Sequence, residues 1–367
     1  MDHIIELLSR ELDRPVQHVE NIVTLLDEGN TVPFIARYRK ELHGAMDDQL
    51  IRQLADRLQY LRNLQARRDE VKQSIENQGK LTDELSAAID AASTLAEVED
   101  LYRPYKQKRR TRATMAREKG LEPLAELAFA IGPAVDLEAA AQDYIGPEKG
   151  VETAEDALQG ASDIVAEWIS DDADVRKLLR ELYWRRAVIV SKAAAKEPED
   201  SVYRLYYEFS SPVSKTQGHQ ILAMNRGERE EILKVDVEMD RETALVALRR
   251  RAVPGRAAME FVRAAAEDAY DRLIAPSLER ELRGELTDRA SEGAIGQFAL
   301  NLKPLLMQPP VKGFVTMGLD PGYRMGCKVA VVDPTGKVLD TTVVYPTHGE
   351  RGKNEAIDKL AVLIKKH

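Results

Sequence analysis

Cysteine is almost absent from this sequence of 367 residues, since Cys327 is the single example. One cysteine excludes a disulfide framework within the chain and favours a reducing compartment. No Cys and His residues stand at the spacings typical of zinc sites. No apolar run is long enough to cross a bilayer, and the amphipathic start MDHIIELLSREL does not resemble a signal peptide. We therefore expect a cytoplasmic protein with no membrane partner, no bound metal and no other cofactor.

Aromatic residues are also scarce, at 5%, and the formal net charge is −9. A negative chain is not a general polyanion binder, so any contact with nucleic acid must come from a local basic patch. Charged residues make up 31% and hydrophobic residues 44%, which is a globular composition. Ala, Leu, Glu and Arg dominate and favour helix, and the length allows two or three domains.

Apolar residues recur at helical spacing over most of residues 1–310. Two short helices precede Gly29, and they fit either a helix-turn-helix or two helices of a bundle. Asp47 caps a predicted helix that runs to about Gln78, with a narrow apolar stripe and a charged outer face, which indicates a structural spine. Thr94 and Glu97 stand at the spacing of a capping box for a further helix.

The predicted helices continue through the middle of the chain. One begins at Asp171 and extends past Ile189 and Val190. Alternation of apolar and charged residues over 233–239 predicts a half-buried strand. Residues 255–306 are almost wholly helical, with expected breaks near Pro276 and around Gly284 or Gly293. Residues 308–310 read as a linker, after which the pattern changes from helical to β.

Residues 314–345 contain three β-rich runs separated by turn residues, which predicts two consecutive hairpins. Asp320 ends the first run, where a carboxylate can hold a metal or a metal-bound phosphate. Such an Asp begins the sites of RNase H and resolvase nucleases and of actin-like ATPases, and in both it is one of several required residues. The alternative is a structural Asp that bonds its own turn. Asp333, at the far end of the next strand, is better read as a turn residue.

The basic segment, residues 102–120, is the sharpest charge feature of this acidic chain. Its only acid is Glu118. Dense Arg and Lys residues can neutralise phosphates with a strong salt dependence. Two other interpretations stay open: a solvated loop, or a patch that docks on acidic helices of the same chain. The candidate cations are Arg103, Lys106, Lys108, Arg109, Arg110, Arg112, Arg117 and Lys119.

A second candidate surface lies in residues 31–40, TVPFIARYRK. Phe34, Ile35 and Tyr38 can dock on the protein, while the cations point away. The segment is then either a surface loop with an apolar anchor or a corner that contacts phosphates. The candidate cations here are Arg37, Arg39 and Lys40.

Several stretches taken together resemble the bacterial Tex proteins, the transcription accessory proteins. The matching stretches are TVPFIARYRKE, LYRPYKQKRRTRATMAREKGLEPLA, HQILAMNRGE, LIAPSLERELRGELTDRASEGAI, NLKPLL and GLDPGYRMGCKVAVVD. They lie in register over essentially the whole chain, which is far more specific than any one motif. One departure is Met325, where a Thr is expected.

The resemblance implies a mainly α fold. An elongated multi-helix N-terminal region is followed by the first β-hairpins of an α/β RNase H-like domain of the YqgF type. The expected divisions are residues 1–196, a helical domain; 197–311, a central helical region with a short β element; and 312–367, a partial RNase H-like domain. The family's later helix-hairpin-helix and S1 modules, which carry much of its nucleic-acid binding, are missing here.

The resemblance also implies a nucleic-acid-binding transcription accessory factor related to a eukaryotic elongation factor. We expect a non-enzymatic protein that binds RNA or DNA without sequence preference and that has the transcription machinery as a further partner. A metal-dependent nuclease is the first alternative, but only Asp320 matches a required acid, and the family's site is generally degenerate. A protein-interaction scaffold is the second. An actin-type ATPase is the weakest, because no second phosphate loop is found.

Overall fold

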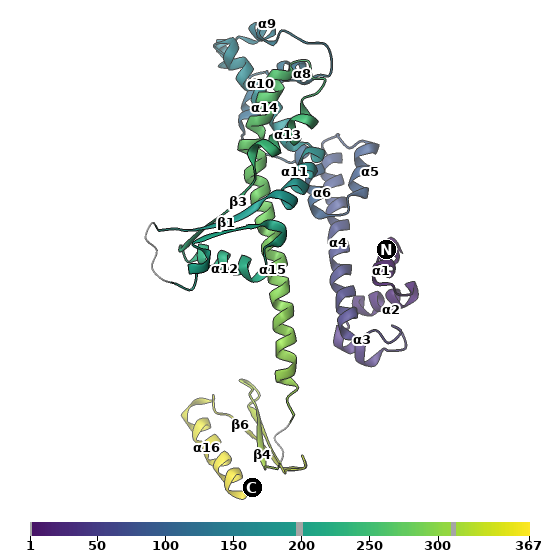
Figure 1. Cartoon of the computed structure of the whole chain (residues 1–367). Helices are drawn as coiled ribbons and strands as arrows, with labels where there is room; N and C mark the ends of the chain where they lie inside the picture. Colours follow the sequence, from purple (N-terminus) through teal and green to yellow (C-terminus); the bar gives the residue numbers. More distant parts are fainter. Residues whose placement is uncertain (1, 196–200, 310–312) are drawn as a thin grey trace. The chain divides into compact units, whose positions relative to one another are not determined.

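The computed structural model describes residues 2–195, 201–309 and 313–367 (Figure 1). Contacts divide the chain into two compact units, one that ends at Ser291 and one from Glu292 to His367. The structure is mainly α-helical, as the sequence predicts, and the described residues include two small antiparallel sheets. Residues 196 and 311, where domain boundaries are expected, lie outside the described residues, so those boundaries stay predictions.

The chain begins with four helices around one small core. They are α1 (Asp2–Leu12), α2 (Val16–Asp27), α3 (Val32–Tyr38) and the long α4 (Asp48–Glu76). Leu8, Ile22, Ile35 and Leu54 are buried together in this core. Asp47 caps α4 as predicted, because its carboxylate accepts a 2.8 Å hydrogen bond from the Leu50 amide.

Residues 31–40 are mostly helical, which corrects the expectation of a loop. The Thr31 hydroxyl caps α3 by accepting from the Phe34 amide, and Pro33 lies in the first turn, where a missing N–H costs nothing. Ile35 is the buried anchor, but Tyr38 does not dock, since it remains 57% exposed.

The next helices carry the basic segment and its support. They are α5 (Asp83–Ala91), α6 (Leu95–Tyr102), the 3₁₀ turn η1 (Arg103–Tyr105), α7 (Arg112–Glu118), α8 (Glu122–Phe129), α9 (Leu137–Ala141) and α10 (Ala154–Asp171). Thr94 caps α6 as predicted, while the Glu97 carboxylate reaches one residue further back and accepts from the Ser93 amide.

The predicted helix after Asp171 is shorter than expected, because α11 spans only Ala173–Arg186 and is capped by Asp172. Ile189 and Val190 lie in strand β1 (Val188–Ala193) instead. A run of β-branched residues fits a pleated strand better than a helix. Strands β2 (Glu208–Pro212) and β3 (Leu233–Glu238) flank β1 in the order β2-β1-β3, and both pairs are antiparallel. Strand β3 alternates buried and exposed residues as predicted.

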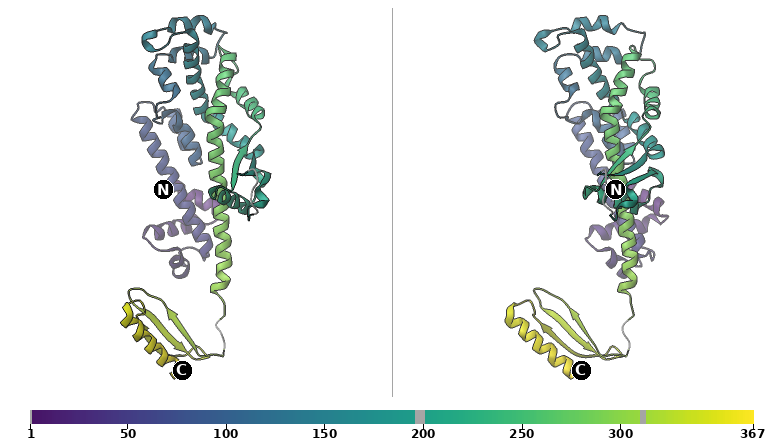
Figure 2. Two further views of the ribbon diagram at one scale, coloured as in Figure 1. Left: turned by 90° about the vertical axis from the view of Figure 1, so that its left-hand side faces the viewer. Right: turned by 60° about the vertical axis from the view of Figure 1, so that its left-hand side comes forward.

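The later part of the first unit is built on a long helix. The remaining helices are α12 (Gly218–Arg229), α13 (Arg241–Ala252), α14 (Met259–Asp268), the π-helical turn η6 (Ala269–Ile274) and α15 (Ala275–Leu306). Figure 2 shows the strands beside α15, and Arg283 of α15 donates a 3.0 Å hydrogen bond to the Val235 carbonyl of β3.

An irregularity occurs near Pro276 as expected, because α14 is followed by the π turn η6 and α15 begins at Ala275, but the expected break at Gly284 or Gly293 does not occur, because α15 runs through both. Pro276 lies in the first turn of α15, and the only local irregularity is the π turn just before it. A glycine costs a helix about 1 kcal/mol relative to alanine. The buried stripe of Leu278, Leu282, Leu286 and Ala290 outweighs that cost over the first part of the helix.

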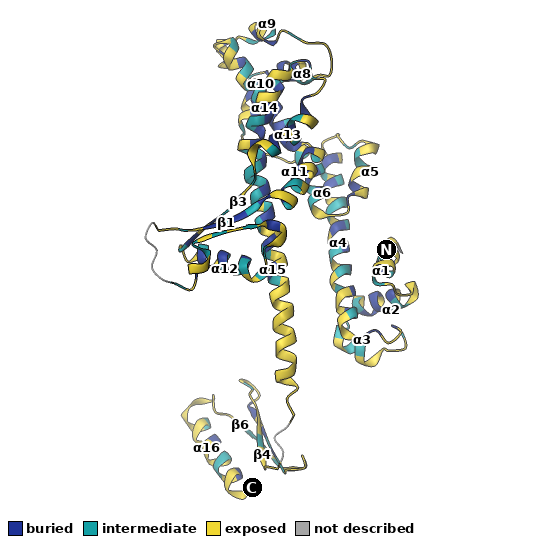
Figure 3. Ribbon diagram, in the orientation of Figure 1, coloured by how far each residue is buried: buried dark blue, intermediate teal, exposed yellow. Residues whose placement is uncertain are grey.

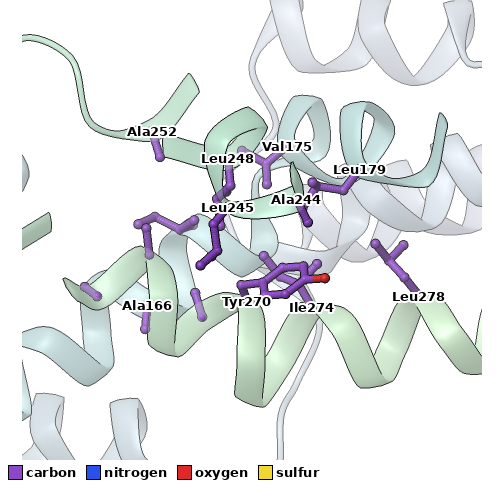
Figure 4. Close-up of a cluster of buried hydrophobic side chains, with 14 of the residues drawn as sticks. Ala166, Val175, Leu179, Ala244, Leu245, Leu248, Ala252, Tyr270, Ile274 and Leu278 are labelled. Atoms are coloured by element: carbon purple, nitrogen blue, oxygen red, sulfur yellow. The ribbon is translucent and has the colours of Figure 1, made fainter. Parts of the chain in front are cut away.

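The largest core joins α10, α11, α13, α14 and α15 (Figure 4). Leu179 of α11 and Leu245 of α13 are fully buried there beside Ile274. The hydroxyls of Tyr183 and Tyr270 lie 2.9 Å apart inside this core. Burial colouring in Figure 3 shows that the later turns of α15 differ, since they are largely exposed.

The second unit contains the two predicted hairpins. Strands β4 (Thr316–Asp320), β5 (Cys327–Val332) and β6 (Val338–Val344) pair antiparallel in that order, and α16 (Gly349–Lys366) covers one face of the sheet. Asp333 is a turn residue, as its carboxylate accepts from the Thr335 and Lys337 amides. Pro310 of the predicted linker lies outside the described residues.

Candidate nucleic-acid interface

The basic segment is folded against the protein and is not a free loop. It leaves α6 through η1, crosses to Thr111 and forms α7. The Thr111 hydroxyl caps α7 by accepting a 3.0 Å hydrogen bond from the Thr114 amide. Helix α7 packs on α10 through the buried Ala113 and Ala116. A side chain at Gly160 of α10 would approach Leu121 to 2.3 Å, so this close packing depends on a glycine.

Three cations of the basic segment are used inside the protein. Lys108 pairs with Asp171 and lies 3.5 Å from Glu167, both on α10. Arg117 donates to Glu167 at 2.8 Å and to Glu122 at 3.1 Å. Lys119 donates to the Gly150 carbonyl at 2.8 Å. This part of the segment therefore docks on an acidic helix of the same chain, which is one of the interpretations that the sequence left open.

The two acids of α10 have opposite pKa shifts. Burial raises the pKa of Glu167, but hydrogen bonds from Arg117 and Thr111 and the charges of Lys108 and Arg117 outweigh it, so that its pKa is lowered overall. For Asp171 the burial is the larger influence, and its pKa is raised despite the bond from Lys108. The shifts differ because Asp171 is more strongly affected by burial and lacks the hydrogen bond that Arg117 gives to Glu167.

The other cations of the segment are exposed, except Arg103, which is half-buried. Arg103, Arg109 and Arg112 have no carboxylate within 4 Å among the described residues, and we call them the unpaired arginines. Lys106 is 3.8 Å from Glu99 with a 59% exposed side chain, and Arg110 is 3.0 Å from Glu118 with 71% exposed. Exposed pairs of this kind contribute at most about 1 kcal/mol, so a phosphate can displace either carboxylate.

Two cavities flank Lys108. One, of about 590 Å³, is lined by Lys80, Lys106, Arg117 and Trp168 among others. The other, of about 430 Å³, lies between the basic segment, α10 and the start of α15, and includes Arg103, Arg109 and Arg280. Cations from distant parts of the sequence therefore meet at one surface of the first unit.

The second candidate surface, formed by Arg37 of α3 and by Arg39 and Lys40 directly after it, is smaller, and we call it the α3 surface. The Arg39 guanidinium lies 5.5 Å from the Phe34 ring centre, and that of Arg37 lies 6.0 Å from the Tyr38 ring centre. Lys40 is exposed. Stacking on the rings holds the two guanidiniums near the surface without neutralising them. The structure does not bring these cations into either cavity beside Lys108.

Asp320 ends β4 as predicted and is exposed, directly opposite Lys328 of β5. Over residues 2–195, 201–309 and 313–367, no three His, Cys, Asp or Glu side chains gather into a group that could hold a metal ion. Asp320 is therefore a single carboxylate next to a cation in the part of the second unit that the structure describes.

Sequence reasoning missed three residues of this interface. Glu167 and Asp171 are one helical turn apart on α10, and that spacing is a signal for an acidic face that could receive the basic segment. Arg280 carried no signal, because only the fold brings α15 beside residues 103–109. No helix in the described ranges is long and apolar enough to span a membrane.

Comparison with known proteins finds one family along the chain. Three protein-family models match: the Tex-like protein N-terminal domain over residues 2–76, the Tex central region-like model over residues 132–298 and the Tex protein YqgF-like domain over residues 314–367. Their order along the chain is the order of the segments that carry the resemblance in the sequence.

Full-chain relatives agree. The uncharacterized protein YdcI of Bacillus subtilis is 45% identical over 98% of this chain and 51% of its own length. The transcriptional accessory protein Tex of Neisseria gonorrhoeae is 41% identical over 100% of this chain and 48% of its own. The human S1 RNA-binding domain-containing protein 1 is 34% identical over 98% of this chain and 37% of its own length. The chain thus spans about half the length of the bacterial relatives, and it belongs to the Tex family.

Proposed function

We propose that this chain is a non-enzymatic, nucleic-acid-binding transcription accessory factor that contacts phosphate backbones through the basic segment. The observation that carries the proposal is the set of unpaired arginines Arg103, Arg109 and Arg112 on a folded support. Relatives support the class: one is called a transcriptional accessory protein, and another is named for an S1 RNA-binding domain.

The division of labour within the segment gives the proposal its physical basis. Lys108 and Arg117 are held by Glu167 and therefore fix the backbone of the segment. The unpaired arginines keep their full charge, and a guanidinium binds a phosphate through two parallel hydrogen bonds. Contacts to phosphate carry no base information, so binding is independent of sequence and includes both RNA and DNA. The transcription machinery is the expected protein partner, and the expected location is the cytoplasm.

The α3 surface is proposed as a second and weaker contact through Arg37, Arg39 and Lys40. Its three exposed cations can reach phosphates, but they lie on the core of α1–α4 and not beside the Lys108 cavities. Fewer neutralised phosphates mean a smaller contribution to affinity.

The absence of catalysis is part of the proposal. Two-metal phosphoryl transfer needs several carboxylates that converge on one site. Around Asp320 the described residues supply only one, and Lys328 lies opposite it. An assay of labelled RNA and DNA with Mg²⁺ or Mn²⁺ tests this directly. Metal-dependent cleavage by the chain that is lost on Asp320→Ala would establish the nuclease alternative.

The binding experiment uses the triple variant Arg103→Ala, Arg109→Ala, Arg112→Ala. Fluorescence anisotropy with single- and double-stranded RNA and DNA, at several salt concentrations, gives the affinity and the salt slope. Three lost phosphate contacts predict a slope smaller by about 2 to 3 and at least a tenfold weaker affinity at low salt.

A control with the same change in net charge separates local contact from general electrostatics. The control is a second triple variant, which removes three exposed cations from α11, α14 and α16: Arg185→Ala, Arg263→Ala and Arg351→Ala. We expect less than about a twofold change in affinity, because distant charges are screened. Equal losses in the two variants, or no loss in the first, would show that the basic segment is structural.

A further inference from the structure

The cavity of about 430 Å³ beside Lys108 gathers an excess of cations. Its walls come mainly from the basic segment, from α10, from the π turn η6 and from the first turns of helix α15. The lining has more cations than anions. The cations are Arg103, Lys106, Lys108, Arg109 and Arg280, and the anions are Glu99, Glu167 and Asp171.

Pairing inside the lining leaves only arginines unneutralised. Glu167 and Asp171 are occupied by Lys108 and Arg117. Glu99 accepts from Arg67 at 2.6 Å and lies 3.8 Å from Lys106. Arg103, Arg109 and Arg280 are thus three guanidiniums around one cavity without a carboxylate within 4 Å among the described residues.

A buried charge network lies behind the cavity. Arg176 of α11 is fully buried, and its Nη2 donates a 3.1 Å hydrogen bond to the hydroxyl of Ser277. Ser277 in turn lines the cavity. Its Nη1 has no acceptor. Arg176 and Arg180 share two carboxylates, Asp100 and Glu281. The two arginines and the two carboxylates balance each other, so the network leaves no anion for the nearby Arg103. Burial and the positive charge of Arg103 together lower the pKa of Arg176.

The neutral part of the lining also suits an oxyanion. Four residues with neutral polar side chains also line the cavity: Gln107, Thr111, Ser170 and Ser277. Among the described residues no aromatic ring lines it, so they offer no platform on which a base could stack. The volume lies within the range of small-ligand sites and exceeds that of one phosphate, which leaves room for the attached sugar.

We propose that this cavity is a phosphate-binding subsite in which Arg103 of the basic segment and Arg280 of α15 grip one phosphate of a bound nucleic acid. The inference rests on the proposed function and deepens it. It adds a specific position for one phosphate and a residue, Arg280, outside the basic segment. Binding then joins the basic segment to α15, so the nucleic acid is held by two elements instead of one.

The test uses Arg280→Gln, which removes the charge and keeps much of the length. Arg280 is exposed and has no ion pair in the described parts of the chain, so the variant folds with an unchanged unfolding midpoint in circular dichroism. Anisotropy with a 3′-labelled single-stranded RNA should show about a tenfold loss of affinity, as for a lost charged hydrogen bond. The salt slope should fall by about 0.7, one single-strand phosphate contact. Arg263→Gln on α14 is the matched control and should change neither the affinity nor the salt slope.

Two probes distinguish the source of the phosphate. The same RNA is used with and without a 5′-monophosphate. If Arg280→Gln loses affinity only for the phosphorylated probe, the ligand is a terminal phosphate. If it loses affinity equally for both probes, the ligand is a backbone phosphate. Either result supports the subsite. Unchanged affinity of Arg280→Gln for both probes, together with weak binding by the triple variant, would overturn the subsite and leave the proposed function intact. Unchanged binding by both variants would overturn both.

Discussion

Two sets of arginines in the first unit have the same chemistry and opposite surroundings. Arg176 and Arg180 of α11 are buried or nearly so, and they share Asp100 and Glu281. Arg103, Arg109 and Arg112 of the basic segment have no carboxylate within 4 Å in the described part of the chain. The first set joins α6, α11 and α15 to each other, while the second keeps its charge for a ligand. A cation is available for binding where the fold supplies no anion, or only an exposed one that a phosphate can displace.

The distinction also runs through the basic segment itself. Lys108 and Arg117 resemble the α11 arginines, since their partners Glu167 and Asp171 are almost fully buried. A folded anchor of this kind holds neighbouring side chains in place before a ligand arrives, which lowers the entropy cost of binding. Charge density alone, as the sequence presents it, does not separate the anchor residues from the binding residues.

The largest effect on stability is expected from Asp100→Ala. Asp100 accepts from Arg176 at 3.0 Å and from Arg180 at 2.7 Å. Removing one member of a buried ion network leaves the other charges uncompensated and costs about 3–5 kcal/mol. Urea unfolding followed by circular dichroism measures the loss.

The matched control is Asp90→Ala. Asp90 pairs with Lys72 at 2.5 Å, but its side chain is 54% exposed. An exposed pair contributes at most about 1 kcal/mol. If Asp100→Ala shifted the urea midpoint no further than Asp90→Ala, the α11 network would not hold the helices together.

A smaller, pH-dependent effect is expected from Glu167→Gln, which loosens the anchor of the basic segment. Breaking its bonds with Arg117 and Lys108 should lower the free energy of unfolding by about 1–3 kcal/mol at neutral pH. The folded-state pKa of Glu167 lies below its ordinary value of 4.5. Its stabilisation is therefore fully present above pH 4.5 and is lost as the pH falls through the folded-state pKa.

Urea unfolding of both proteins from pH 7 down into the acid range checks this dependence. The difference between the wild type and Glu167→Gln should shrink steadily below pH 4.5. The exposed Glu126→Gln on α8 serves as the control and should stay close to the wild type throughout. A difference that grew in acid would contradict the pKa assigned to Glu167.

The smallest effect is expected from Arg37→Ala, Arg39→Ala, Lys40→Ala on α3. These cations are exposed and lie outside the Lys108 cavities. We expect about a threefold loss of RNA affinity at low salt, from weak and screened contacts. Anisotropy under the conditions used for the basic segment measures it. A loss as large as that of the basic-segment triple variant would make α3 an equal contact and remove the contrast between the two surfaces.

Much of the fold could be predicted from local chemistry. Asp47 and Thr94 were both predicted as helix caps, and each side chain accepts the expected amide. Capping depends on residues three positions apart, so the sequence contains it in full. The hairpins of β4–β6 were also predicted, because turn residues and alternation are local signals.

Errors arose where packing overrides local preference. Glycines suggested breaks in α15, but the buried Leu278, Leu282 and Leu286 keep the helix continuous. Ile189 and Val190 continued an apolar pattern from α11, but pairing with β2 and β3 makes them a strand. Neither outcome is visible in a window of neighbouring residues, because the deciding contacts come from distant segments.

The sequence by itself determined the family, the helical class, the caps, the hairpins and the existence of a basic segment in an acidic chain. These depend on residue identity and short-range spacing. Only the tertiary structure decided which cations are free. Glu167 and Asp171 lie about 50 residues or more from the cations they neutralise, and Arg280 reaches the same cavity from another helix. Charge pairing is a matter of distance in space, and a sequence lists charges without those distances.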